Sequence, residues 1–353
     1  MSLIRIVTVI AVAATGLLAP NFAIATIAYN ITDLGDAASF TSLNDAGQMA
    51  GISNDAVLYS NGSLLPLGTL GGSFSTGLGI NNSGDVAGYS ALNGAPGSHA
   101  FLYSGGSMHD LGTLGGAITS KGYDVNDSGD VTGDSNGHVF LYSGGSMHDL
   151  GTLGGAEGHG NAINDNGQIA GSSTITGDTA DHAFLYSGGS MHDLGTVGGN
   201  NSEGYDLNNS GQVVGYSLTA SDVQHAFLYS GGMMHDLGTL GGTSSAADGI
   251  NDSGQVVGQS AIPGSGAQHA FLYTNGLMVD LNSLIDPSSG WVLQDGRAIN
   301  NAGQILADAR IGGDIHSVLL TPVPEPSSFA LVSMALAGIL ALASRRLRIR
   351  LKA

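Results

Sequence analysis

One eighteen-residue stretch of this 353-residue chain recurs almost unchanged. HAFLYSGGSMHDLGTLGG begins at His99, returns with one substitution each at His138, His182 and His225, and returns in a more divergent form at His269. A catalytic site is needed only once, so a motif copied this faithfully requires an architectural explanation first. We therefore expect a repeat protein in which each copy is one structural unit.

A second pattern, resembling Gly-x-Ile-Asn-x-x-Gly-x-Val-x-Gly, counts the units. Its asparagine occurs at seven positions: Asn44, Asn81, Asn126, Asn164, Asn208, Asn251 and Asn300. Successive copies lie 37 to 49 residues apart. This period lies in the range of β-propeller blades, each of which is a small antiparallel sheet.

The unit at 121–153 is predicted to contain four strands. They cover 121–126, 130–134, 138–143 and 147–153. Gly144-Gly145 suits a two-residue hairpin turn with positive φ at both central positions, which would place Tyr142 opposite Met147. Asn126 is expected to cap the turn between the first two strands, with Gly129 supplying positive φ.

The two ends of the repeat region complement each other. Residues 29–35 resemble a fourth strand with no other strands before it, whereas the last unit supplies only its first three strands, ending at 316–320. A closed ring that uses the first segment to complete the last blade repairs both defects and leaves no open edge, unlike an open solenoid. The predicted fold is therefore all-β, a seven-bladed β-propeller of four-stranded antiparallel blades closed by the N-terminal strand.

The chain ends have the features of targeting signals. Residues 1–25 contain one arginine, an apolar run and the small-x-small sequence ending with Ala23 and Ala25, which is typical of a secretory signal peptide rather than a retained anchor or a buried strand. The repeat domain would then occupy 26–322. After it, Pro324, Glu325 and Pro326 precede an apolar stretch long enough for a transmembrane helix and an arginine-rich end.

This tail at 323–353 resembles the PEP-CTERM sorting signal of Gram-negative bacteria. The resemblance implies cleavage near the motif by an exosortase-type sorting protease. It also implies transient anchoring in the inner membrane by the C-terminal helix, followed by delivery to the outer surface or an exopolysaccharide matrix. The chain contains no cysteine, so the exported domain must fold without disulfides.

The repeat itself resembles the HAF-type extracellular repeat, which is named for His-Ala-Phe. That tripeptide begins at His99, His182, His225 and His269, while Val139 replaces the alanine after His138. The family is defined by its repeat and its export. The resemblance therefore implies location and architecture, and it supplies no catalytic residue.

Charge limits the possible partners. Residues 26–322 contain three basic and 27 acidic residues, a net charge of 3 − 27 = −24. Such a field repels phosphate backbones and anionic membrane surfaces, which argues against nucleic acid as a partner. Cations and neutral sugars remain compatible with it, and surface glycans are candidate partners.

Most chemically capable side chains are repeated, which favours structural roles. Ten of the eleven histidines occupy repeat positions, and we expect those that open the third strands to cap backbone groups, with metal binding or proton transfer as the alternative. Asp124 to Gly129 imitates the start of an EF-hand loop, but Ser135 replaces the final glutamate, so a hairpin turn is preferred over weak Ca²⁺ binding. No other cofactor is predicted.

Unrepeated residues are the better candidates for ligand contact. Trp291, Lys121 and Arg297 break the repeat, and the connections between second and third strands vary in length and sequence. Trp291 could stack on a sugar or pack in the core. We predict a non-catalytic binding or adhesion protein that uses the variable loop face. The alternatives are a polysaccharide-processing hydrolase or lyase with a site in the central channel, or a soluble lectin.

Overall fold

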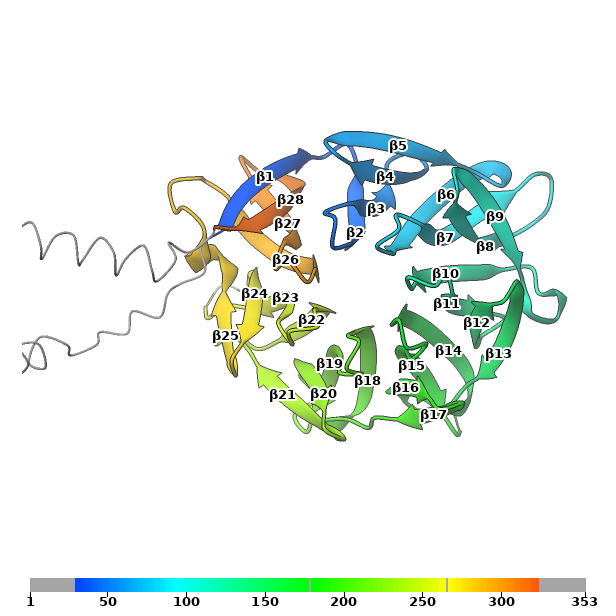
Figure 1. Cartoon of the computed structure of the whole chain (residues 1–353). Coiled ribbons are helices and arrows are strands. Elements are labelled where there is room, and N and C mark those ends of the chain that lie inside the picture. Colours follow the sequence, from blue (N-terminus) through cyan, green and yellow to red (C-terminus); the bar gives the residue numbers. More distant parts are fainter. Residues whose placement is uncertain (1–28, 178, 265, 324–353) are drawn as a thin grey trace, which may run out of the picture. The chain divides into compact units, whose positions relative to one another are not determined.

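The computed structural model describes residues 29–323 except 178 and 265. These residues form 28 strands in seven four-stranded sheets that surround one axis (Figure 1). The compact unit spans Tyr29–Thr321. The fold is a seven-bladed β-propeller of antiparallel blades, as the repeat predicts. The predicted signal peptide, the PEP motif and the predicted transmembrane helix lie outside the described residues.

Each blade places one strand beside the axis and three strands successively farther out. The strands of each blade are given from the axis outwards. Blade 1 contains β2 (Ser39–Leu43), β3 (Met49–Ile52), β4 (Ala56–Ser60) and β5 (Ser63–Gly68), and blade 2 contains β6 (Gly71–Ile80), β7 (Val86–Leu92), β8 (Ser98–Ser104) and β9 (Ser107–Gly112). Blade 3 contains β10 (Ser120–Val125), β11 (Val131–Ser135), β12 (His138–Ser143) and β13 (Ser146–Gly151), and blade 4 contains β14 (Gly154–Ile163), β15 (Ile169–Ile175), β16 (Asp181–Ser187) and β17 (Ser190–Asp193). Blade 5 contains β18 (Gly198–Leu207), β19 (Val213–Thr219), β20 (Gln224–Ser230) and β21 (Met233–Gly238); blade 6 contains β22 (Ser245–Ile250), β23 (Val256–Ala261), β24 (Gln268–Thr274) and β25 (Leu277–Asp280); blade 7 contains β26 (Val292–Ile299), β27 (Ile305–Ile311), β28 (Asp314–Pro322) and β1 (Tyr29–Gly35). Two short 3₁₀ helices, η1 (Leu114–Gly116) and η2 (Leu281–Leu284), lie between blades. Among the described residues, no helix is long and apolar enough to cross a membrane.

Blade 3 confirms the strand assignment made from its sequence. Strand β12 has the predicted bounds, and the other three strands begin and end within two residues of the prediction. Gly144 and Gly145 have φ values of 60° and 81°, and Tyr142 lies opposite Met147. The Gly-Gly turn therefore sets the register of the outer hairpin, as expected.

The core lies between the faces of neighbouring blades. The phenylalanine of the third strand is fully buried in blades 2 to 6, and in blade 3 it packs with Ala87 and Ala100 of blade 2. Its neighbour in the sheet is a glycine, Gly133 opposite Phe140. A Cβ at Gly133 would clash with the Phe140 ring and with the Lys121 carbonyl oxygen, so the packing requires glycine there.

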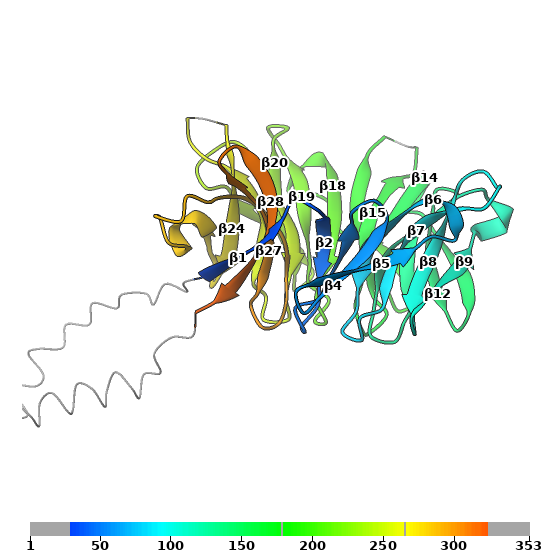
Figure 2. The same cartoon turned by 90° about the horizontal axis from the view of Figure 1, so that it is seen from above.

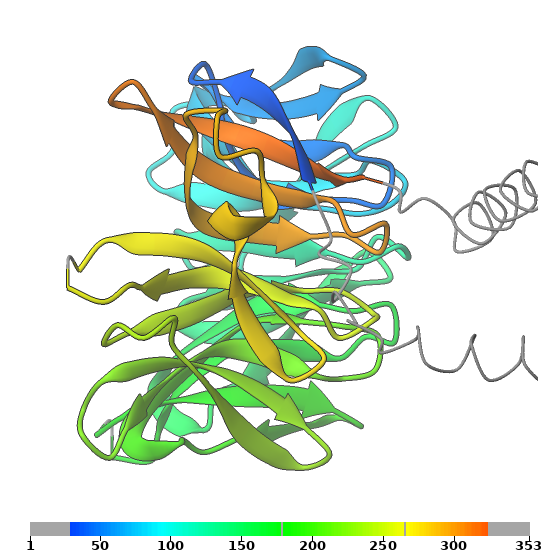
Figure 3. The ribbon, with the colours of Figure 1, turned by 90° about the vertical axis from the view of Figure 1, so that its left-hand side faces the viewer.

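The N-terminal strand closes the ring. Strand β1 pairs with β28 and completes blade 7, which confirms the predicted closure. Figures 2 and 3 show these two strands side by side, although they come from opposite ends of the described chain. Tyr29 is buried in the resulting blade, and Asp33 Oδ1 lies 2.9 Å from His316 Nδ1.

Candidate functional site

The repeated asparagines, which we call the turn asparagines, link the blades around the axis. Each caps its own turn: Asn126 Oδ1 accepts from the amides of Ser128 and Asp130 at 3.1 and 3.0 Å. Each Nδ2 also donates to the backbone oxygen of the next turn asparagine, at 2.9 to 3.2 Å. The seventh bond runs from Asn300 to Asn44 and closes the circle. The cap was predicted, whereas the link between blades was not.

The next residue along the chain forms a second circle. Its backbone amide donates to Oδ1 of the equivalent residue in the next blade, at 2.8 to 3.1 Å. The members are Asp45, Asn82, Asp127, Asp165, Asn209, Asp252 and Asn301. An odd number of members cannot alternate between acid and amide all the way round. Asp127 and Asp165 are consequently the one adjacent acidic pair in this circle.

Every innermost strand contains a β-bulge that leaves one residue out of the pairing with the second strand. Each pairing of first and second strands skips the residue three positions before the turn asparagine. These seven residues, which we call the bulge residues, are Thr41, Leu78, Tyr123, Asn161, Tyr205, Asp248 and Arg297. Because a bulged residue leaves the ladder, its side chain is released from the pleat of the sheet. This position, which has six residue types in seven blades, therefore borders the axis.

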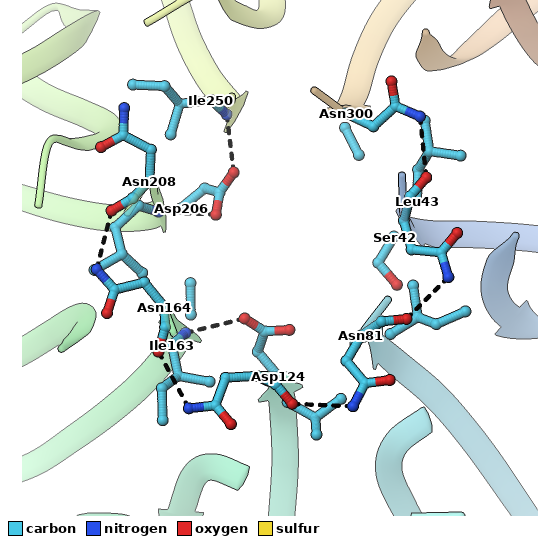
Figure 4. A pocket seen from close by; sticks show the side chains of 18 of the residues that line it. Ser42, Leu43, Asn81, Asp124, Ile163, Asn164, Asp206, Asn208, Ile250 and Asn300 are labelled. Atoms are coloured by element: carbon cyan, nitrogen blue, oxygen red, sulfur yellow. Dashed lines mark hydrogen bonds between the residues drawn. The ribbon is translucent and has the colours of Figure 1, made fainter. Parts of the chain in front are cut away.

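The bulge residues and both circles enclose an axial cavity of about 280 Å³. All seven bulge residues line it. Figure 4 shows the side chains of Asp124 and Asp206 projecting from its wall. These two acids occupy the position two residues before the turn asparagine, where blades 2 and 4 have Gly79 and Ala162.

Backbone amides of the next blade fix both acids. Asp124 Oδ2 accepts from the Ile163 amide at 2.9 Å, and Asp206 Oδ2 accepts from the Ile250 amide at 2.8 Å. Burial raises the pKa of Asp124 to about 7, and the carboxylates of Asp206 and Asp165 add to the rise. Burial likewise raises the pKa of Asp206 to about 6. Both carboxyl groups therefore titrate near neutral pH.

A third acidic group lies where blades 6 and 7 meet. Within the described residues, Asp248 Oδ2 and Asp295 Oδ1 are buried and receive no hydrogen bond from a nitrogen or hydroxyl donor. Burial and the adjacent Asp295 hold the pKa of Asp248 well above its usual range. One proton shared between the two carboxyl groups satisfies both oxygens. Arg297 completes the group, with Nη1 at 3.2 Å from Asp295 and Nη2 at 2.7 Å from Asp308.

A mixed polar and aromatic group lies where blades 3 and 4 meet. Tyr123 donates its hydroxyl to Asp134 at 2.6 Å, and His159 Nδ1 lies 3.4 Å from the same carboxylate oxygen. The bond to Asp134 raises the pKa of His159. Lys121 Nζ lies 5.6 Å from the centroid of the Tyr89 ring. The two unrepeated cations Lys121 and Arg297 therefore both lie on innermost strands, in blades 3 and 7.

Trp291 is separate from these residues. It lies between η2 and β26, is half-buried, and packs edge-to-face against His316 at 5.5 Å between ring centroids. It is not among the residues that line the axial cavity. Of the three candidates chosen from the sequence, Arg297 lines the cavity, Lys121 lies farther along an innermost strand, and Trp291 lies at the edge of blade 7.

The histidines that open the third strands bind carboxylates instead of the expected backbone groups. Six Nδ1 atoms lie 2.7 to 2.9 Å from an aspartate of the adjacent outer strand. The aspartate lies where the sequence Met-His-Asp brings it beside the histidine across the hairpin, as in His138 and Asp149. Within the described residues, no three His, Asp or Glu side chains are grouped so that they could hold a metal ion.

Sequence reasoning missed the acids of the cavity as a group. Asp124 and Asp206 occupy a position that is otherwise small, but the stretch from Asp124 to Gly129 was interpreted as a hairpin turn, with weak Ca²⁺ binding as the alternative. The structure places residues 126–129 in a hairpin turn and aims Asp124 at the axis instead. Asp248 and Asp295 gave no sequence signal, because the bulge that brings them together has no fixed residue type.

Comparison with known proteins identifies the tail. Residues 322–346 match the PEP-CTERM protein-sorting motif, and this region includes Pro324, Glu325 and Pro326. PEP-CTERM signals mark exported proteins, and the motif implies processing by an exosortase. A search among curated proteins found no match.

Several solved structures are similar to this chain at low sequence identity. Dipeptidyl peptidase 4 of Porphyromonas gingivalis is 10% identical with a TM-score of 0.45, over 79% of this chain and 50% of its own. YCF48 bound to D1 peptide is 9% identical with a TM-score of 0.44, over 84% of this chain and 97% of its own. The Aleuria aurantia lectin AAL, as its N224Q mutant, is 12% identical with a TM-score of 0.35, over 84% of this chain and 100% of its own. These likenesses bear on no ligand or reaction of this chain, which is an exported protein with a PEP-CTERM sorting motif.

Proposed function

We propose that this exported protein is a non-catalytic binding protein of the cell surface or exopolysaccharide matrix, with its ligand site in the axial cavity. The observation that carries the proposal is the contrast along each innermost strand. The turn asparagine is the same in every blade, whereas the bulge residue three positions earlier has six identities in seven blades. Structural copies need no such variety, but a ligand that is not sevenfold symmetric does. The resemblance to HAF-type extracellular repeats accords with this role.

The lining is suited to a small polar ligand. A volume of about 280 Å³ lies just below the range of about 300 to 1,000 Å³ that is usual for drug-sized ligands. Tyr123 and Tyr205 offer rings for stacking, while Asn161 and Thr41 offer hydrogen-bonding groups. Such a lining fits one sugar-sized unit, including the end of a glycan chain. The variable connections between second and third strands would then add contacts outside the cavity.

The rival function is a polysaccharide-processing hydrolase or lyase that uses the same cavity. The observation that favours it is the pair of acids with pKa values of about 7 and about 6, Asp124 and Asp206, since general acids and bases work best near the operating pH. A lectin that binds sugar without cleaving it is the third possibility, and it shares the binding step with our proposal.

Binding and product release, measured together on the full-length protein in nonionic detergent, distinguish these functions. We expect glycan binding without release of reducing ends, and a loss of at least about tenfold in affinity for Tyr205→Ala and Arg297→Ala. Arg310→Ala is the matched control, because Arg310 is the remaining basic residue of 26–322 and does not line the cavity. Sustained turnover that is lost on changing Asp124, Asp206 or Arg297 would establish the rival function.

A further inference from the structure

The axial cavity carries a strong excess of negative charge. Seven aspartates line it: Asp45, Asp124, Asp127, Asp165, Asp206, Asp248 and Asp252. Among the described residues, Arg297 is the one basic side chain in the lining, and its guanidinium already binds Asp295 and Asp308. An anionic ligand would therefore meet unopposed repulsion, and a neutral ligand would leave the charge uncompensated.

Two acids of the wall are held in place. The amides of Ile163 and Ile250 fix Asp124 and Asp206, as described above. The adjoining blade makes room for Asp124, because a Cβ at Gly79 would lie 2.6 Å from Asp124 Oδ1. The carboxylates are thus preorganised, and their orientation does not depend on a ligand.

Within the described part of the chain, Ser42 is an unpaired polar residue in the wall of the cavity. Its Oγ is buried and has no hydrogen-bond partner among the described residues, and Ser42 belongs to the lining. Figure 4 shows Ser42 on the wall across the cavity from Asp206. A buried hydroxyl normally has a partner, and Ser42 Oγ gains one from a ligand only if its side chain rotates into the cavity.

The dispersed acids favour an organic cation over a bare metal ion. Within the described residues, no three His, Asp or Glu side chains converge with the geometry of a metal site. The acids come instead from several blades around a cavity of about 280 Å³ that also contains two tyrosine rings. An ammonium group interacts favourably both with separate carboxylates and with the faces of aromatic rings.

We infer that the axial cavity binds a primary-ammonium sugar, a hexosamine unit, with its cationic nitrogen between Asp124 and Asp206 and its hydroxyls on the polar bulge residues. This inference rests on the proposed function, since it names the ligand class of the same cavity. Proton linkage supports it. A cation favours the ionised carboxyl groups, so binding should release protons where Asp124 and Asp206 titrate. The charged groups that face these two acids are also acidic, namely Asp165 and Asp252.

The test is isothermal titration calorimetry of the full-length protein with glucosamine, glucose and N-acetylglucosamine. At about pH 6.5, glucosamine should bind at least about tenfold more tightly than either neutral sugar. Its affinity should rise between about pH 5 and about pH 7, where its own ammonium stays charged, and buffers with different ionisation enthalpies should report the released protons. A glucosamine oligomer tested beside the monomer distinguishes a chain end from the free sugar.

Asp124→Asn and Asp206→Asn should each lower the affinity for glucosamine about tenfold and leave binding of the neutral sugars unchanged. Asp110→Asn is the matched control, since Asp110 lies in the outer strand β9 of blade 2. If either variant fails to fold, as judged by thermal unfolding, the comparison of the three sugars on the unchanged protein decides alone.

The outcomes separate this inference from the proposed function. Equal or tighter binding of N-acetylglucosamine, or binding of CaCl₂ without binding of glucosamine, overturns the ammonium ligand and leaves a ligand-binding cavity in place. The proposed function itself is overturned if glycan binding is insensitive to Tyr205→Ala and Arg297→Ala and if neither glucosamine nor the two neutral sugars bind in the cavity.

Discussion

The outer hairpins and the axial wall of this propeller follow opposite rules. The third and fourth strands of blades 2 to 5 carry nearly the same residues, and their phenylalanines are all fully buried. The bulge residues lie on the same blades yet differ from one blade to the next. Packing between blades poses a similar problem in each blade, and blades 2 to 6 share one solution. The bulge frees one side chain per blade from that constraint, so its identity varies, as the proposed ligand site would require.

The largest loss of stability should come from removing the N-terminal strand that completes blade 7. Deleting residues 29–35 leaves blade 7 with three strands and exposes the edge of β28. We expect loss of most of the ~5–15 kcal/mol that stabilises a typical domain, together with association of the open edges. Circular dichroism during heating and light scattering after gel filtration measure both effects. A cooperative transition at the temperature of the unchanged protein would show that closure is dispensable.

The core phenylalanine tests the packing side of the comparison. Phe140 is fully buried, so Phe140→Ala should lower the free energy of unfolding by about 3–5 kcal/mol in urea titration. Asn161→Ala, at a bulge position, removes a single bond to the Gly204 carbonyl oxygen and should cost about 1 kcal/mol. Equal losses in free energy of unfolding at Phe140 and Asn161 would contradict the division between the packed core of the blades and the less constrained cavity lining.

The turn asparagines combine features of both regions. They are the same in every blade, and they also line the axial cavity. Asn126→Ala removes two accepted bonds and one bond donated to the next blade, for an expected loss of about 2 kcal/mol in urea titration. Asn126→Asp keeps the acceptor but places a buried carboxylate oxygen against the Asn164 carbonyl oxygen in an acidic wall, so it should cost at least as much as the alanine variant near neutral pH. A cost for the aspartate variant well below that of alanine would assign most of the effect to the cap and little to the link between blades.

Asp124 should make stability depend on pH. Its pKa is raised from 3.8 to about 7, so the folded chain binds more protons than the unfolded chain between these values. The free energy of unfolding contributed by this group therefore falls as pH rises through that window. Asp124→Asn should flatten this fall, so between about pH 4 and about pH 8 the variant should gain about 4 kcal/mol in free energy of unfolding over the unchanged protein. Superimposable pH profiles from urea titration would exclude an ionising Asp124 in the wall.

The smallest effect is expected at the pair that joins β1 to β28. The bond to Asp33 raises the pKa of His316, so its contribution is present below the ordinary histidine pKa and is lost as pH rises through the folded value. Blade 1 has Asp55 and Pro66 at the equivalent positions and still forms four paired strands, so the fold tolerates loss of the pair. His316→Gln should therefore lower the melting temperature slightly at about pH 5.5 and leave it unchanged at about pH 8. A large loss at both values would mean that His316 acts through packing.

Much of the architecture could be predicted, because it depends on contacts between close neighbours in the chain. A two-residue turn such as Gly144-Gly145 sets the register of its own hairpin, and residues 29–35 carry the same pattern as the other outer strands. The His–Asp pairs were half visible in the same way. The histidines were identified at repeat positions, but their contacts were assigned to backbone groups instead of to the aspartates across the hairpin.

The sequence by itself determined the number of blades, the outer hairpins, the closing strand and the sorting tail, since each depends on a local pattern or on its repetition. Only the tertiary structure decided that Asp124, Asp206 and Asp248 share one cavity and that the turn asparagines form one circle. Those contacts join different blades, for example 44 residues apart between Asp206 and Ile250. They depend on a bulge that any residue type can occupy, so the ring geometry, and no motif, brings these side chains to the axis.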